Sequence, residues 1–179
     1  MNNKSVLYIT QAAVIAAIYV VLTQIANALG LASGAIQIRF SEALTILPYF
    51  TPAAIPGLFV GCIIGNITTG CMPLDTVFGS IATLLGALGT YYIAHGLKKP
   101  GTPGFYATSK IKAWLSPVPP IVANTLIVPF VIKFVYGSET IIPLIMLTVF
   151  IGELISCEAL GMLLLFALDK RKSAIFGGM

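Results

Sequence analysis

The sequence predicts an all-α integral membrane protein, with six transmembrane helices and both termini in the cytoplasm. Of its 179 residues, 58% are hydrophobic and only 9% are charged, and the mean hydropathy is +0.98. A soluble domain carries roughly 25% charged residues, because its surface must be hydrated. The apolar stretches lack the long polar alternation of a membrane β-barrel. Since lipid requires every backbone group to be satisfied within the chain, we expect residues 1–179 to form a single helical transmembrane domain.

Turn signals divide the apolar sequence into six segments. A spanning helix needs about 20 apolar residues, and Ser41 is a good N-cap for the second segment. That segment is short, because Pro52 follows closely. Residues 42–70 form either two spans or one broken hairpin on this evidence. The expected helices cover about 5–29, 41–50, 56–69, 74–96, 120–135 and 140–168.

The distribution of basic residues predicts the orientation. With six spans, three basic groups lie on one side of the membrane, whereas an odd number of spans would divide them. Basic loops mark the cytoplasmic side, so both termini are expected there, in the cell membrane. Nucleic acid is not needed to explain the net charge of +4. The three groups comprise Lys4, then Lys98, Lys99, Lys110 and Lys112, then Lys170, Arg171 and Lys172.

Polar residues gather at the opposite ends of the helices and predict a ligand vestibule that faces outward. A simpler alternative is that helix ends are polar in any membrane protein. The set comprises Gln24, Asn27, Gln37, Arg39, Glu42, Asn66, Thr68, Thr69, Asp75, Thr76, Lys133 and Glu139.

Glu153 is expected about 20 Å along the last helix, at ~1.5 Å per residue. A carboxylate near the middle of the bilayer marks a functional site or a buried partner, and Asn124 is a candidate partner. Glu158 lies five residues further, on a different face of an α-helix. An alternative function is therefore an ion- or proton-coupled carrier or channel that uses Glu153 and Glu158. A third hypothesis is a structural membrane protein without a ligand.

The first helix carries two overlapping small-xxx-small pairs, Ala12/Ala16 and Ala13/Ala17. Small residues let helices approach closely in lipid, either within the bundle or against a partner. The chain has no Walker A sequence and no nucleophile–base motif, so we expect no enzyme and no hydrolysis of ATP by this chain. Its three cysteines lack a CxxC pair. We interpret them as packing residues and expect no metal.

Four runs of the sequence resemble the QueT family. They are Arg39 to Pro48 (RFSEALTILP), Ala54 to Cys62 (AIPGLFVGC), Asp75 to Ser80 (DTVFGS) and Ile81 to Leu84 (IATL). The resemblance implies a substrate-binding S component of an energy-coupling-factor (ECF) transporter. It also implies the six-helix fold of such components and uptake of a queuosine precursor, the aminomethyl-deazaguanine preQ1.

The same resemblance implies partners. These are a transmembrane coupling subunit, docked by the alanine pairs of the first helix, and two cytoplasmic ATPases that use ATP. A bound preQ1 would present two donors on its guanine-like edge and one ammonium group, and both suit carboxylates. Phe40, Tyr49 and Phe78 are aromatic candidates for stacking on its ring. The candidate ligand residues are the acids Glu42, Asp75 and Glu153, the amides Asn66 and Gln37, and Arg39, which could instead pair with Glu42.

Overall fold

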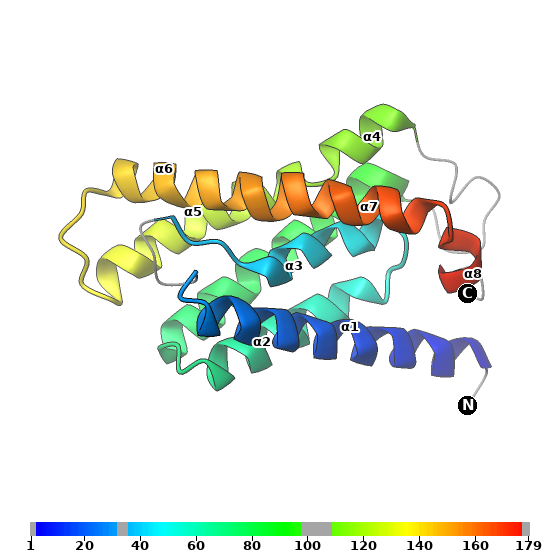
Figure 1. Cartoon of the computed structure of the whole chain (residues 1–179), viewed down its shortest axis with the longest axis horizontal. Coiled ribbons are helices and arrows are strands. Elements are labelled where there is room, and N and C mark those ends of the chain that lie inside the picture. Colours follow the sequence, from blue (N-terminus) through cyan, green and yellow to red (C-terminus); the bar gives the residue numbers. More distant parts are fainter. Residues whose placement is uncertain (1–2, 32–35, 98–108, 177–179) are drawn as a thin grey trace.

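A computed structural model of the chain describes residues 3–31, 36–97 and 109–176. These residues form a bundle of helices along one common axis, with no strand among them (Figure 1). The helices α6, η2 and α7 join into one continuous rod. The elements are α1 Asn3–Ala28, η1 Phe40–Tyr49, α2 Ala54–Thr68, α3 Pro73–His95, α4 Lys110–Leu115, α5 Val118–Phe134, α6 Ile142–Glu153, η2 Leu154–Leu160, α7 Gly161–Asp169 and α8 Lys172–Phe176.

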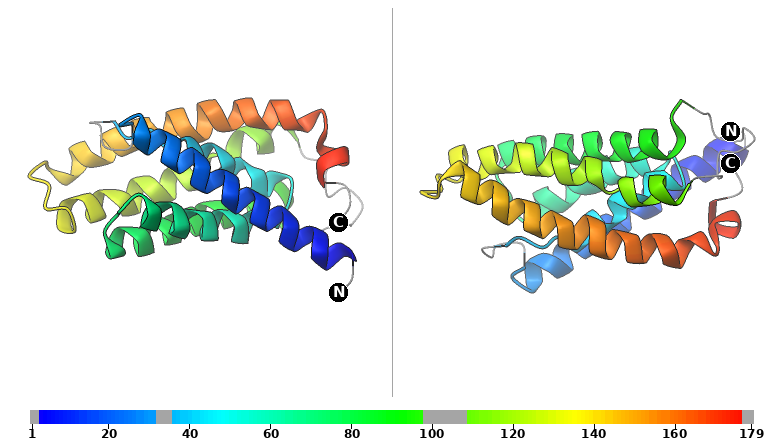
Figure 2. Two further views of the ribbon diagram at one scale, coloured as in Figure 1. Left: turned by 60° about the horizontal axis from the view of Figure 1, so that its bottom comes forward. Right: turned by 90° about the horizontal axis from the view of Figure 1, so that it is seen from above.

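Four helical segments of the described chain are long and apolar enough to cross a membrane: Lys4–Ala28, Pro73–His95, Lys110–Phe134 and Ile142–Asp169. The fifth apolar helix, α2, has 15 residues, which at ~1.5 Å per residue is about 22 Å and shorter than a ~30 Å hydrocarbon core. The membrane class is therefore confirmed by length and composition. The six-span count and the cytoplasmic side of the termini stay predictions, although the start of α1 and helix α8 lie at the same end of the bundle (Figures 1 and 2).

The element boundaries follow the expected ranges within a few residues, with one error. No helix was expected between 96 and 120, where Lys110 and Lys112 lie, and the structure has the short helix α4 there. The Ser109 hydroxyl accepts a hydrogen bond from the Lys112 backbone N–H at 3.3 Å, which caps the helix. Lys98 and Lys99 lie outside the described residues.

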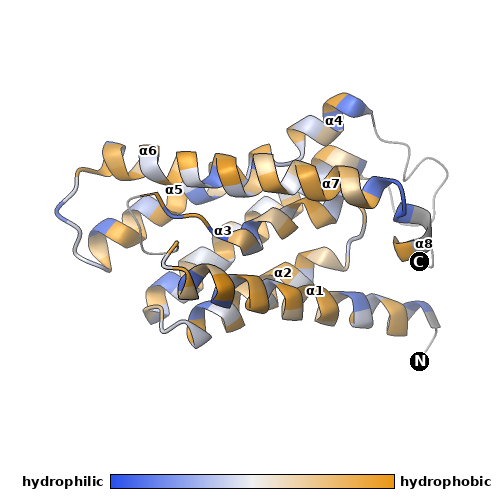
Figure 3. Ribbon diagram, in the orientation of Figure 1, coloured by the Kyte–Doolittle hydropathy of each residue, from blue (hydrophilic) through white to orange (hydrophobic). Residues whose placement is uncertain are grey.

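Most residues along the lengths of the helices are apolar (Figure 3), and many of the large ones are exposed. Val21 is 56% exposed and Leu163 is 68% exposed, whereas the carboxylic acids Glu42 and Glu153 are only 1% and 7% exposed. The apolar side chains thus face outward and the carboxyl groups face inward. This arrangement suits a lipid environment, because ionisable groups within a membrane face the interior of the helix bundle.

Helices α1 and α2 pack backbone to backbone through small residues. A Cβ atom built on Gly57 would lie 2.7 Å from the Ala12 carbonyl oxygen, and one on Gly61 would lie 3.1 Å from the Ala16 Cα. Such distances leave no room for a larger side chain on either helix. The pair Ala12/Ala16 therefore packs within the chain.

The overlapping pair Ala13/Ala17 faces the other way. Both of these alanines are exposed, whereas Ala16 is buried. The sequence could not separate the two pairs, and the position of α2 does so.

Two uncommon helix types meet in the interior. The 3₁₀-helix η1 runs for ten residues, although runs beyond three or four residues are uncommon. It packs against the π-helix η2 and against α7. The expected short helix at 41–50 is thus confirmed in position. The expectation that Glu158 lies on a different face from Glu153 assumed α-helical geometry. That assumption was wrong, because η2 is a π-helix.

Candidate ligand-binding site

A polar cavity of about 400 Å³ is lined by residues of α1, α2, α3, α5 and their connections. The ends of these helices that contribute to it lie opposite the start of α1 and helix α8 (Figure 1). The volume of the cavity lies within the range of small-molecule sites. Four of the six candidate ligand residues line it, and Glu42 and Glu153 do not. The lining residues are Thr23, Ala26, Asn27, Gln37, Arg39, Asn66, Thr69, Gly70, Cys71, Asp75, Val128, Ile132 and Tyr136.

Asp75 lies in the first turn of α3 and is buried. The free backbone N–H groups and the dipole of a helix N-terminus stabilise a carboxylate there. Tyr136, from the turn between α5 and α6, donates its hydroxyl hydrogen to Asp75 Oδ2 at 2.7 Å. Burial, and secondly this hydrogen bond, raise the pKa of Tyr136. The phenol therefore stays protonated at neutral pH and keeps its role as donor.

Gln37 and Arg39 reach the cavity because Gln37 lies directly on α6. A Cβ atom at Gly152 would overlap the Gln37 carbonyl oxygen, so glycine is required for this approach. The Arg39 backbone N–H donates to Ser156 Oγ at 3.2 Å, which fixes Arg39 to η2. Within the described residues the Arg39 guanidinium has no ion pair and no hydrogen bond.

Asn66 projects from the last turns of α2 and is 3% exposed. Its amide donates to Cys62 Sγ at 3.6 Å, one helical turn below. A Cβ atom at Gly79 would lie 3.3 Å from the Asn66 amide nitrogen and 3.7 Å from Asp75 Oδ1. The glycine therefore lets the amide and the carboxylate share one wall of the cavity.

A second polar layer lies deeper in the bundle, around Glu42 of η1. Tyr19 donates its hydroxyl to Glu42 Oε1 at 2.5 Å, and the Asn124 amide donates to Glu42 Oε2 at 3.4 Å. Three elements, α1, η1 and α5, thus meet at one carboxyl group. Full pairing is what a buried carboxyl group requires.

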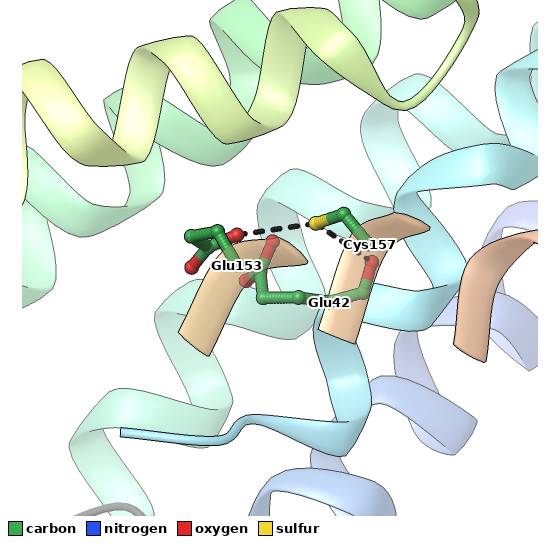
Figure 4. A group of neighbouring side chains, drawn as sticks. All are labelled: Glu42, Glu153 and Cys157. Carbon is green, nitrogen blue, oxygen red and sulfur yellow. Dashed lines mark hydrogen bonds between the residues drawn. The ribbon is translucent and has the colours of Figure 1, made fainter. Parts of the chain in front are cut away.

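Glu153 belongs to the same layer (Figure 4). The Cys157 thiol donates to Glu153 Oε2 at 3.1 Å, and the sulfur also lies 3.6 Å from the Glu42 carbonyl oxygen. One ligand atom from each of these three residues lies within 4.8 Å of the others, which is close enough to share one ion. Because both Glu42 oxygens already accept hydrogen bonds, we interpret the cluster as a hydrogen-bond network.

The two layers are one helical turn apart. Thr23 of the cavity wall donates to the Tyr19 carbonyl oxygen at 2.8 Å, and Asn66 lies four residues after Cys62. A turn rises about 5.4 Å. Tyr19, which binds Glu42, therefore lies one helical turn from the Thr23 wall of the cavity.

Several expectations for this region are wrong. Arg39 forms no salt bridge with Glu42 among the described residues, although the two charges interact electrostatically at longer range. Phe40 and Tyr49 do not line the cavity, and Phe78 is exposed on the bundle surface. Glu158, by contrast, is half-buried and stays outside the carboxyl cluster, in agreement with the expectation that it does not share a face with Glu153.

Other expectations hold in part. Asn124 does bind a buried carboxyl group: its amide donates to Glu42 Oε2, and it also interacts with Glu153. The prediction that the cysteines serve only packing missed Cys157, which bonds to Glu153. The sequence also gave no reason to select Tyr19 or Tyr136.

The fold and the site define a class, a helical membrane protein with a polar cavity at one end and a buried layer of carboxyl groups. The profile of the QueT transporter family matches residues 9–170, and the chain belongs to this family. The chain is also 34% identical over 85 residues to the "Queuosine precursor transporter QueT" of Lactococcus lactis subsp. cremoris (strain MG1363). That alignment covers 48% of this chain and 50% of the relative, so the chain spans about half the length of the curated relative it matches. No solved structure matches the chain.

Proposed function

We propose that this protein is the substrate-binding membrane subunit of an ECF transporter and takes up preQ1. The observation that carries the proposal is the cavity itself, in which Asp75, Asn66, Gln37 and Arg39 converge from separate parts of the chain. A carboxylate accepts from the two neighbouring donors of a guanine-like edge. Amides and a guanidinium supply donors for the carbonyl and ring nitrogen acceptors.

The charge balance favours a cationic ligand. Three buried carboxyl groups, Asp75, Glu42 and Glu153, lie in this part of the bundle, and the cavity lining contains one guanidinium, that of Arg39. Excess negative charge away from water is costly unless a cation or a proton neutralises it. The aminomethyl group of preQ1 is protonated at neutral pH and supplies one such charge. A neutral nitrile analogue such as preQ0 does not.

Energy for uptake would come from partners, because the sequence has no Walker A motif. We propose a transmembrane coupling subunit and two cytoplasmic ATPases, with six spans and cytoplasmic termini as the sequence predicts. The exposed pair Ala13/Ala17 is the small-residue surface available to the coupling subunit, because Ala12 and Ala16 are occupied by α2. The carrier alternative gains nothing from the geometry, since Glu158 does not join Glu153.

Equilibrium binding to the purified protein tests the proposal. We expect preQ1 to bind more tightly than preQ0, and Asp75→Asn to weaken preQ1 binding by about 2–5 kcal/mol, the range for loss of one desolvated charge partner. Glu139→Gln is the matched control, because Glu139 is an exposed carboxylate at the same end of the bundle. Absence of preQ1 binding by the intact wild-type protein would refute the proposal. Equal affinity of wild type and Asp75→Asn would remove Asp75 from the site.

A further inference from the structure

Tyr136 is the only aromatic side chain among the described residues that line the polar cavity. It is 47% exposed, and no other described residue of the lining offers a ring. The remaining lining is aliphatic, polar or charged. Tyr136 is therefore the candidate in this lining for stacking on a planar ligand.

The ring is held in place at its far end. Its hydroxyl donates to Asp75 Oδ2 at 2.7 Å and accepts from the Met72 backbone N–H at 3.3 Å. Both hydrogen-bonding roles of the phenol are thus used, and each ties it to the start of α3. A side chain that is already immobilised loses little conformational entropy when a ligand binds.

The turn that carries Tyr136 is also fixed. Gly137 has a φ of +67°, a conformation that glycine adopts without strain. The Lys133 ammonium donates to the Ser138 carbonyl oxygen at 2.8 Å and closes the turn. The aromatic ring is therefore carried by the defined turn between α5 and α6, and its hydroxyl contacts the start of α3.

We infer that Tyr136 contacts the ligand directly and that its ring stacks on a planar heterocycle whose donor edge binds Asp75. Asp75 Oδ2 accepts the Tyr136 hydroxyl, and no described residue donates a hydrogen bond to Asp75 Oδ1. The same pair of residues can thus supply both a ring face and a carboxylate oxygen. This inference rests on the proposed function and adds a specificity-determining residue to it.

Three variants separate stacking from a purely structural role. Tyr136→Leu removes the ring, and Tyr136→Phe keeps the ring but removes the hydroxyl bond to Asp75. Phe134→Leu is the matched control, because Phe134 is an aromatic residue near the same turn that does not line the cavity and is largely exposed. Binding of preQ1 is measured for each purified variant, together with its melting temperature in detergent.

We expect Tyr136→Leu to weaken preQ1 binding about 5- to 150-fold, the range for loss of one base–aromatic stack. Tyr136→Phe should weaken binding less than Tyr136→Leu does, because it keeps the ring and loses only the two hydrogen bonds that hold it. Phe134→Leu should be unchanged. Equal weakening by Tyr136→Phe and Tyr136→Leu would assign the effect to the hydroxyl bond and overturn the stacking. Wild-type affinity in Tyr136→Leu would remove Tyr136 from the site. A wild-type protein that binds no preQ1 would instead refute the proposed function, and this inference with it.

Discussion

The two alanine pairs of α1 give the sharpest test of the structure. The residues are adjacent in sequence and chemically identical, yet Ala16 lies against α2 and Ala17 is exposed. Replacement by leucine should therefore have different consequences at positions 16 and 17. We predict that Ala16→Leu destabilises the fold, and that Ala17→Leu, with or without Ala13→Leu, leaves the fold intact but blocks the coupling subunit.

The magnitude follows from the contact between α1 and α2. A Cβ atom on Gly61 would already lie 2.8 Å from Tyr19 Cβ and 3.1 Å from the Ala16 carbonyl oxygen. Leucine at position 16 adds three carbon atoms to this contact. Overpacking of a filled interior costs about 1–3 kcal/mol or more, whereas a surface substitution costs within about 0.5 kcal/mol. Tyr19 also bonds to Glu42, so displacement of α1 should weaken ligand binding as well.

The assay compares Ala16→Leu with the double variant Ala13→Leu/Ala17→Leu. Melting temperature and preQ1 binding are measured on purified protein, and uptake is measured with the coupling subunit and ATPases present. We expect the first variant to lose stability and affinity. The second should keep both and lose uptake, because bulk on a small-residue face prevents close helix approach. Equal stability of the two variants would refute the assignment of faces. Normal uptake by the double variant would refute the docking surface.

Three further predictions concern the site and the topology. Gly152→Ala should weaken preQ1 binding although Gly152 itself does not line the cavity, because the added Cβ atom overlaps the Gln37 carbonyl oxygen and displaces Gln37. Ligand binding and the melting temperature of the purified variant test this prediction. Glu42→Gln and Glu153→Gln should each weaken preQ1 binding, and unchanged affinity in both would make the deeper layer purely structural. In a background without native cysteines, Ser138→Cys should react with an impermeant thiol reagent from outside the cell and Gly104→Cys, which lies outside the described residues, should not. Labelling of both from outside would contradict six spans.

The composition and the order of apolar segments determined the class of this protein. A chain with 9% charged residues cannot hydrate its surface, so lipid is its solvent, and turn residues then divide it into helices. The ends of α3 and α5 were predictable within two residues because glycine, proline and basic residues end apolar runs there. The polar end of the bundle was predictable for the same reason, and Gln37, Arg39, Asn66 and Asp75 do meet in one cavity.

Only the tertiary structure decided which polar residues reach that cavity. Glu42 and Glu153 do not line it, because η1 enters the bundle deeply and lies against η2. Sequence spacing along one helix carries no information about the depth at which a neighbouring helix lies. The deeper hydrogen bonds to Glu42 join residues 23 and 82 positions apart.

The same limit explains the aromatic residues and the alanine pairs. Tyr136 lies in the turn between α5 and α6, and only the packing of that turn against α3 brings the Tyr136 hydroxyl to Asp75. Ala12/Ala16 and Ala13/Ala17 have the same local pattern and the same helix propensity. Gly57 and Gly61 of α2 pack against Ala12 and Ala16, because two helices approach closely only where both present small residues. The sequence thus determined that the protein lies in lipid and where its helices begin and end, and the packing between helices determined which residues line the cavity.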